Sequence, residues 1–382
     1  MSTMERILRL MADKKASDVY LSANSPALIK INGQALPINS QMLPADAPLN
    51  LLAEIVRPDR IEELKELGEL NMGLPVEGIG NFRISAFRQR GSYAAVIRFI
   101  PTDIPTLESL NVPSVLANLI MEKRGLLLMV GATGVGKSTT LASMIDHRNA
   151  TALGHILTIE DPIEFIFTNK KSVINQREVG SDTQSLQLAL KNALRQAPDV
   201  ILIGEIRDRE TMSAAIAYAQ SGHLCIATMH ANNSYQALNR ILSFYPAEVR
   251  PTLLGDLAAA MKAIVSQRLL RTVAGGRAPA VEVMLNTTLI AELIEKGDFS
   301  GVREAMEKSM SEGSQTFELD IARLISEDIV TRKEGLLHAD SPTNLMWRLE
   351  NDFHAAAKAA AEPEEDPDDQ PSFTEITLDV KH

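Results

Sequence analysis

The sequence predicts an α/β protein of two domains, in which a small mixed α+β domain precedes a larger domain with helices packed on a parallel sheet. Three observations carry this prediction. Segments 126–130, 156–159, 200–203 and 224–227 are almost wholly apolar, which is typical of parallel strands buried on both faces. Helical stretches separate the later segments. The 382 residues also exceed the roughly 250–300 residues at which single cores stop growing.

Composition restricts the class of function. The chain has 45% hydrophobic and 23% charged residues, close to the average for globular proteins. Its net charge of −11 is concentrated in segment 361–382, so the body of the chain is close to neutral. Affinity for nucleic acid comes mainly from cationic side chains that displace counterions, and no such excess is present. We therefore expect no nucleic acid as a partner.

The sequence predicts neither secretion nor direct membrane insertion. Cys225 is the only cysteine, which excludes an internal disulfide or a four-cysteine zinc site and fits a reducing cytoplasm. Residues 1–12 lack the apolar core of a signal peptide, and no apolar run reaches the roughly 18 residues that a membrane helix needs. The predicted location is cytoplasmic, with any membrane association made through a partner or a surface.

The first domain, residues 1–100, is expected to combine short strands and helices. Segments 19–22, 28–31 and 34–38 have strand character, and Asn32-Gly33 is a hairpin turn signal between the last two. Residues 61–70 are predicted to be helical. No catalytic motif occurs in this domain.

One hairpin of the first domain, residues 81–100, contains a charge anomaly. A symmetric turn near 89–92 places apolar residues of the two strands opposite each other on one face and Arg83 opposite Arg98 on the other. Like charges in a cross-strand pair are destabilising. The pair therefore predicts either a bound anion or a solvated face with a nearby acidic side chain.

The remaining boundaries follow from changes in composition. The proline-rich segment 101–113 is predicted to be an interdomain linker, and residues 114–350 form the second domain. From residue 253 onward the pattern is mainly helical, including 255–270 and 317–329. Residues 351–382 form an alanine-rich stretch that becomes strongly acidic, and this tail is expected to be disordered because it has little to bury.

The strongest motif is Gly-Ala-Thr-Gly-Val-Gly-Lys-Ser at residues 131–138, which matches GxxxxGK[ST] between an apolar strand and a helix-compatible stretch. Glycines let backbone N–H groups surround phosphates at the helix N-terminus. Lys137 is expected to reach the β- and γ-phosphates, and the hydroxyl of Ser138 to ligate magnesium. The predicted cofactors are thus ATP and Mg²⁺. The expected nucleotide-binding residues are Gly131, Ala132, Thr133, Gly134, Val135, Gly136, Lys137, Ser138 and Thr139.

Acidic residues are expected at neighbouring strand ends, because magnesium and the attacking water both need carboxylates there. Residues 199–205 form an apolar strand that begins at Asp199 and ends in Gly-Glu, so Glu205 lies at the ligand-binding end. Glu205 and Asp161 are the predicted carboxylate contributions to the metal site beside Ser138. A surface charge or a helix-capping neighbour is the alternative for Glu205.

Residues 158–164, Thr-Ile-Glu-Asp-Pro-Ile-Glu, place three more carboxylates after a strand. Pro162 ends the strand, so Glu160, Asp161 and Glu164 can point into one space. Any of the three can act as a general base or orient water, and the residues alone do not distinguish them.

Residues 224–228 form another apolar strand, followed closely by His230. This histidine is expected either to contact the γ-phosphate or a carboxylate, or only to cap a loop. Cys225 lies inside the strand and is interpreted as an inert core residue.

Four motifs in this order resemble the secretion ATPases that power type II and type IV secretion and type IV pili. They are the P-loop at Gly131, the acidic box at 159–165, the Walker B strand at 199–205 followed by Arg207-Asp208, and the histidine box from Gly222-His223 to His230. The resemblance extends from residue 17 to about residue 349. The chain is most similar to the PilT and PilU ATPases of pilus retraction, since it lacks the four-cysteine site and extra N-terminal domain of assembly ATPases.

The resemblance implies a PAS-like N-terminal domain, a RecA-like ATPase domain with a helical C-terminal part, and a homohexamer. It also implies partners: a PilT-type retraction ATPase and the inner-membrane platform protein, at which the cytoplasmic motor would be peripheral. Arg83 and Arg98 match arginines that such domains present to bound phosphates. Glu164 and Glu205 match candidate catalytic glutamates, and His230 matches the residue nearest the γ-phosphate.

Some positions depart from the family pattern. Ala132 replaces a usual proline and Val135 a small polar residue, but neither position uses its side chain for phosphate. Residues 288–294, Thr-Leu-Ile-Ala-Glu-Leu-Ile, lack the arginine and asparagine of the AIRNLE-type helix of PilT proteins. Together with the acidic tail, this favours the PilU type over the PilT type.

Two alternatives to a motor for type IV pilus retraction and twitching motility stay open. A RecA-like nucleic-acid translocase would need basic or aromatic pore loops, which the acidic balance and 4% aromatic content disfavour. An accessory subunit that binds ATP and strengthens the main motor differs only in its rate of hydrolysis, and residues do not reveal a rate.

Overall fold

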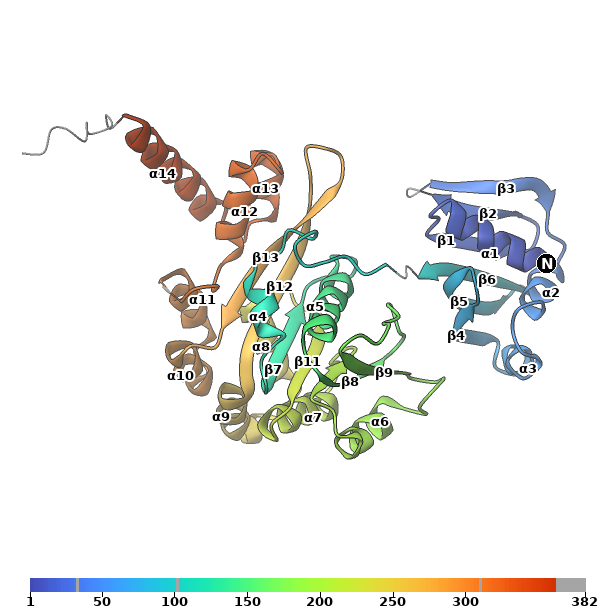
Figure 1. Ribbon diagram of the computed structural model, residues 1–382, viewed down its shortest axis with the longest axis horizontal. Helices are drawn as coiled ribbons and strands as arrows, with labels where there is room; N and C mark the ends of the chain where they lie inside the picture. Colours follow the sequence, from blue (N-terminus) through green and yellow to red (C-terminus); the bar gives the residue numbers. More distant parts are fainter. Residues whose placement is uncertain (32–33, 101–102, 309–310, 362–382) are drawn as a thin grey trace, which may run out of the picture.

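The computed structural model describes residues 1–31, 34–100, 103–308 and 311–361. It contains two sheets, one built before residue 100 and the other after residue 125, and the two sheet-based parts lie side by side in Figure 1. The predicted turn residues Asn32 and Gly33, the start of the expected linker and the acidic segment 362–382 lie outside the described residues.

The N-terminal part packs three helices against a six-stranded sheet of order β3-β2-β1-β6-β5-β4. Helix α1 begins with a capping box, in which Ser2 and Glu5 each accept a hydrogen bond from the other's backbone N–H. The apolar residues of α1, α2 and α3 form one core with the inner face of the sheet. The elements are α1 (Thr3–Asp13), β1 (Asp18–Ser22), β2 (Pro26–Ile31), β3 (Gln34–Met42), α2 (Ala47–Ala53), α3 (Pro58–Leu67), β4 (Glu69–Val76), β5 (Gly80–Gln89) and β6 (Ser92–Ile100).

The hairpin of β5 and β6 has the expected register. Arg83 pairs directly with Arg98, and the apolar pairs lie on the other face. The helix predicted at 61–70 is wrong at its C-terminal end, because α3 ends at Leu67. Gly68 follows with φ of 78°, a left-handed conformation that ends the helix and turns the chain into β4.

The second sheet has seven strands in the order β13-β12-β7-β11-β10-β8-β9. All neighbouring strands are parallel except β12 and β13, which confirms the predicted parallel sheet. Its elements up to β11 are α4 (Val115–Leu119), β7 (Gly125–Val130), α5 (Lys137–Thr151), β8 (Gly154–Glu160), β9 (Ser172–Glu178), α6 (Leu186–Ala193), β10 (Val200–Ile203), α7 (Arg209–Gln220) and β11 (Leu224–Met229).

Helices cover both faces of this sheet. Along β7, Leu126 and Leu128 join the core beneath α6, α7, α8 (Ser234–Ser243) and α9 (Arg250–Ala260), whereas Leu127 and Met129 join the core beneath α4 and α5. This alternation explains why β7 is apolar at every position. Cys225 is fully buried in β11, and burial raises the pKa of its thiol, so it is the inert core residue that the sequence predicts.

The helix predicted at 255–270 is wrong over most of its length. Helix α9 ends at Ala260, and β12 (Met261–Arg271) follows directly and pairs with β7 on one side and β13 (Arg277–Leu285) on the other. Both faces of β12 are covered, so its apolar residues do not alternate simply with polar ones. An apolar segment of this kind has no clear period and can be mistaken for a buried helix.

The C-terminal part consists of α10 (Thr288–Lys296), α11 (Phe299–Lys308), α12 (Phe317–Ser326), α13 (Arg332–His338) and α14 (Pro342–Ala361). Helix α12 ends at residue 326 rather than 329, and α14 continues past the expected tail boundary at 350. In Figure 1, α14 projects away from the sheet. None of the helices in the described ranges combines the length and apolar character needed to cross a bilayer.

Candidate active site

A pocket of about 530 Å³ lies at the carboxyl ends of the parallel strands. The P-loop, the acidic box, the Walker B strand and the histidine box all contribute to its lining. The sheet places them together because β7, β8, β10 and β11 are adjacent and run in the same direction. The predicted site residues in the lining are Arg98, Thr133, Gly134, Gly136, Lys137, Ser138, Thr139, Asp161, Glu164, Glu205 and His230.

The P-loop connects β7 to α5 through backbone that only glycine adopts easily. Gly136 has φ of 89° and precedes the first residue of α5. A Cβ atom at Gly131 would lie 2.7 Å from the carbonyl oxygen of Gln267. Gly131, Ala132 and Val135 do not line the pocket, and they contribute through their backbone carbonyls instead.

The side chain of Lys137 is bound to the first residues of the P-loop. Its Nζ donates hydrogen bonds of 2.8 Å to the carbonyl oxygens of Gly131 and Ala132. Burial lowers the pKa of this lysine, while the nearby carboxylates of Glu205 and Glu164 act in the opposite direction. Lys137 and these two carboxylates line the same pocket.

Both oxygens of Glu205 have side-chain partners. Its Oε1 lies 3.1 Å from His230 Nε2, and its Oε2 lies 2.7 Å from a guanidinium nitrogen of Arg207. Arg207 also lies 3.9 Å from Asp161, so it joins the Walker B strand to the acidic box. The structure thus places His230 against a carboxylate, one of the three roles that the sequence left open for it.

The acidic box brings its three carboxylates into the same pocket, as the proline after the strand predicts. They are not equivalent. Glu160 Oε1 accepts a hydrogen bond of 2.6 Å from the hydroxyl of Thr158, and Asp161 contacts Arg207. The side chain of Glu164 makes no hydrogen bond or ion pair with any other residue in the described ranges, so its carboxylate is free to meet a ligand.

Burial raises the pKa of Glu160 from its ordinary value of 4.5 to about 7, although its hydrogen bonds from Thr158 and Gln176 act in the opposite direction. A carboxyl group with a higher pKa in the folded than in the unfolded state binds additional protons on folding. Between about pH 4.5 and pH 7 the contribution of Glu160 to the free energy of unfolding therefore falls as the pH rises.

Glu160→Gln is expected to stabilise the protein at pH 8 and to change stability little near pH 5. Glutamine keeps an oxygen for Thr158 but cannot ionise, so it removes a cost that grows from about pH 4.5 and reaches its full value of about 3 kcal/mol above about pH 7. Thermal unfolding of both proteins at the two pH values measures the difference. Equal shifts at pH 5 and pH 8 would contradict the raised pKa.

The two arginines of the N-terminal hairpin differ in their surroundings. Arg98 lines the pocket, and its Nε donates a 2.9 Å hydrogen bond to Asp18, whose side chain is almost fully buried. The acid beside this face that the sequence left as an alternative is therefore present. Arg83 is not part of the lining, and it lies directly across from Arg98 on β5.

The sequence also matches a known family along most of its length. Residues 5–319 match the family described as Type II/IV secretion system protein. The chain belongs to this family. The matched region contains every residue that lines the pocket.

Relatives of this family member include two proteins of Pseudomonas aeruginosa. The type IV pilus ATPase PilU is 45% identical over 346 residues, covering 90% of this chain and 91% of the relative. The pilus retraction ATPase PilT is 36% identical over 338 residues, covering 88% and 98%. A crystal structure of the retraction motor PilT with bound ADP matches with a TM-score of 0.85 at 36% identity, covering 91% of this chain and 99% of that one.

These similarities confirm the interpretation of this family member as a P-loop ATPase of the PilT/PilU type. The greater identity to the PilU relative agrees with the departures noted in segment 288–294. The solved structure with ADP supports nucleotide binding as the function of the P-loop pocket.

Sequence reasoning missed several residues of this secretion ATPase that surround the pocket. Leu269 and Arg277 line it from β12 and β13, which were predicted to be helical. Glu178 on β9 accepts hydrogen bonds from the backbone N–H groups of Gly73 in the N-terminal part and Ile163 in the acidic box. The contact with Gly73 joins residues 105 positions apart, and no local pattern reveals it.

Proposed function

We propose that this secretion ATPase hydrolyses ATP as a homohexamer to drive retraction of a type IV pilus, acting with or alongside a PilT-type motor on the inner-membrane platform protein. It would then work in the cytoplasm, peripheral to the inner membrane. The observation that carries the proposal is the convergence of P-loop, acidic box, Walker B strand and His230 on one pocket. The similarity to PilU and PilT supplies the pilus as the site of action.

In the proposed mechanism the P-loop binds and orients the triphosphate. Backbone N–H groups at the start of α5 point toward the phosphates, where the helix dipole favours negative charge. Lys137 moves from the carbonyl oxygens of Gly131 and Ala132 to the phosphates, which are stronger acceptors because they are charged. Lys137, Glu164 and Glu205 line one pocket, so the γ-phosphate would lie between the lysine and the two carboxylates.

The pocket fits a magnesium ion bound together with the nucleotide. No group of three or more acidic, histidine or cysteine side chains in the described residues forms a metal site by itself. Mg²⁺ commonly takes only one or two carboxylates and fills its other positions with phosphates and water. Ser138, Glu205 and Asp161 would contribute oxygens here, and the bound ion would neutralise charge on the phosphates.

Glu164 is the proposed proton acceptor for the attacking water. Glu205 is already engaged by Arg207 and His230, whereas the carboxylate of Glu164 has no competing partner among the described residues. Glu205 would instead hold His230 beside the γ-phosphate. Arg98, together with Arg83 on the adjacent strand, would add positive charge from the N-terminal domain during phosphoryl transfer.

The purified full-length protein is expected to hydrolyse ATP in the presence of Mg²⁺ and to lose this activity when EDTA is added. Arg83→Ala and Arg98→Ala are each expected to lower kcat by roughly tenfold to a hundredfold, because each removes charge that stabilises the transition state. Arg98→Ala also removes the nearest cation from buried Asp18, so thermal unfolding is measured alongside. Unchanged kcat in both variants would mean that the two arginines belong to a solvated face and take no part in catalysis.

The same assay separates the motor from an accessory subunit. Background turnover by a folded wild-type hexamer, equal to that of an inactive P-loop variant, would favour an accessory role. Retraction assays in the source bacterium, with the chain deleted alone and together with its PilT-type partner, then measure what each contributes.

A further inference from the structure

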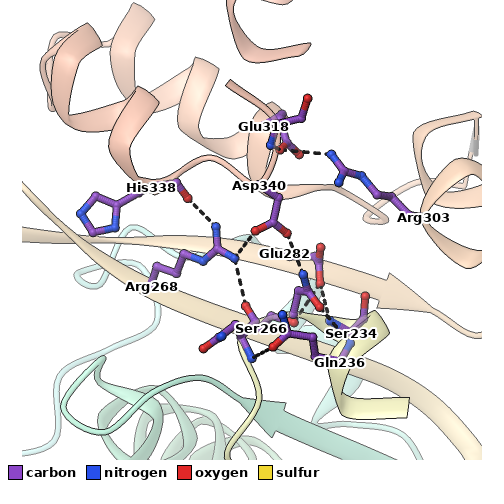
Figure 2. A network of polar contacts seen from close by, with 12 residues as sticks. Ser234, Gln236, Ser266, Arg268, Glu282, Arg303, Glu318, His338 and Asp340 are labelled. Carbon is purple, nitrogen blue, oxygen red and sulfur yellow. Dashed lines mark hydrogen bonds and ion pairs between the residues drawn. The ribbon is translucent and has the colours of Figure 1, made fainter. Parts of the chain in front are cut away.

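The segment that follows His230 is held by residues from three other elements. Residues 232–234 begin two positions after His230, and Ser234 is the first residue of α8. Figure 2 shows this segment contacted by Arg268 on β12, Glu282 on β13 and Asp340 before α14. None of these three residues lines the nucleotide pocket.

Arg268 lies at the centre of the network. One guanidinium nitrogen donates to the carbonyl oxygen of Asn232 at 3.1 Å and to Asp340, and another donates to the carbonyl oxygen of His338. The guanidinium also lies 3.9 Å from the ring centre of Phe317 on α12. A planar fork with several fixed donors can hold all these groups at once, which a lysine ammonium cannot do in the same geometry.

Asp340 completes the connection from the other side. Its Oδ1 accepts from Arg268, and its Oδ2 accepts a 2.8 Å hydrogen bond from the side-chain amide of Asn233. Asn233 in turn caps α8 through its own oxygen. One carboxylate thus joins β12, the start of α8 and the connection between α13 and α14.

Glu282 on β13 binds Ser234, the residue after Asn233. It is 6% exposed and accepts hydrogen bonds from the backbone N–H of Ser234 at 2.8 Å and the hydroxyl of Ser266 at 2.9 Å. The carbonyl oxygen of Asn232 is therefore fixed by Arg268 of β12, and the N–H of Ser234 by Glu282 of β13. Within the segment, the N–H of Asn232 donates to Gln236 of α8 at 3.3 Å.

The neighbouring residue on β12 contacts the P-loop. The side chain of Gln267 donates to the carbonyl oxygen of Val135 at 2.7 Å and accepts from the hydroxyl of Thr140 at 2.8 Å. Successive residues of a strand point to opposite faces, so Gln267 and Arg268 reach the P-loop and the histidine box from one short piece of β12.

We propose that Arg268 and Asp340 are positioning residues for ATP hydrolysis, which hold His230 against Glu205 by fixing residues 232–233 and so make the site depend on the placement of helices α12–α14. This inference rests on the proposed role of His230. A displacement of the connection between α13 and α14 would release Asn233 from Asp340. It would also remove Asp340 and the His338 carbonyl, the two acceptors that orient Arg268 toward the Asn232 carbonyl. The backbone next to the histidine would then be held less firmly, while the contacts of Gln267 with the P-loop stay intact.

The test compares kcat and KM for ATP in Arg268→Lys and Asp340→Asn, alone and combined with His230→Ala. We expect each single variant to lower kcat about tenfold with KM changed less than twofold, because catalysis is sensitive to misplacement of about 1 Å. In the His230→Ala background, the same substitutions are expected to lower kcat by less than twofold. Non-additivity of this size is the signature of residues that act through one another.

A purely structural role predicts a different result, since a network that only stabilises the fold would lower kcat by the same factor in both backgrounds. That outcome would overturn the inference and leave the role of His230 intact. If His230→Ala alone left kcat unchanged, both the role of His230 and the inference would fail. Because Arg268 and Asp340 lie in different parts of the fold, one variant still provides the test if the other fails to fold.

Arg332→Ala serves as the matched control. Arg332 lies on α13, in the same group of helices, and forms an exposed ion pair with Glu350 at 3.7 Å without touching residues 232–234. It is expected to change neither kcat nor its response to His230→Ala. Thermal unfolding midpoints of all variants show whether loss of activity follows loss of stability.

Discussion

Lys137→Ala is expected to abolish ATP hydrolysis, lowering kcat/KM by at least about a hundredfold. The ammonium group is the cation that the P-loop presents to the β- and γ-phosphates, and alanine offers no donor in its place. The fold is expected to survive, because burial already disfavours the charge of Lys137 and lowers its pKa, and within the described residues its side chain donates only to the loop carbonyls of Gly131 and Ala132. Phosphate release and thermal unfolding, measured on one preparation, check both parts.

Lys296→Ala provides the control for this substitution. Lys296 lies on α10 and pairs weakly with Glu292 at 3.7 Å on the surface, far from the P-loop in sequence. It is expected to retain wild-type turnover. Turnover by Lys137→Ala within threefold of wild type would mean that hydrolysis occurs elsewhere or comes from a contaminant.

Glu164→Gln is expected to lower kcat by roughly a hundredfold to ten-thousandfold while ATP still binds. Glutamine keeps the size of the side chain but cannot accept a proton from water. Binding is expected to persist because the P-loop contacts are unchanged and a negative charge near the γ-phosphate has been removed. Single-turnover kinetics with a separate nucleotide-binding measurement distinguish the chemical step from binding.

Glu292→Gln, an exposed substitution on α10, controls for loss of a surface carboxylate. A large loss in Glu205→Gln together with normal turnover in Glu164→Gln would transfer the role of proton acceptor to Glu205. The present assignment depends on Arg207 and His230 engaging Glu205, whereas Glu164 is available.

The sequence predicted which motifs line one pocket, because each motif follows local rules. A P-loop needs glycines, Lys137 and Ser138 in a fixed order, and parallel strands place their terminal residues at one edge of the sheet. Glu164, Glu205 and His230 could therefore be found from apolar runs and the residues that follow them. The register of the β5–β6 hairpin also followed from alternation and a short turn.

The contacts that hold the site in place could not be predicted in the same way. Arg98 pairs with Asp18, which lies 80 positions earlier, and Arg268 pairs with Asp340, which lies 72 positions later. Such pairs depend on tertiary packing rather than on spacing. The strand β12 was missed because both its faces are covered, which removes the period that distinguishes a strand from a helix.

Calorimetric titration of ATP into the folded oligomer with Mg²⁺ present tests the central claim most directly. We expect saturable binding by the wild-type protein and by Glu164→Gln, and no measurable binding by Lys137→Ala. Absence of heat from the folded wild-type oligomer, or equal binding by Lys137→Ala, would contradict a site in which the P-loop and its lysine bind the triphosphate.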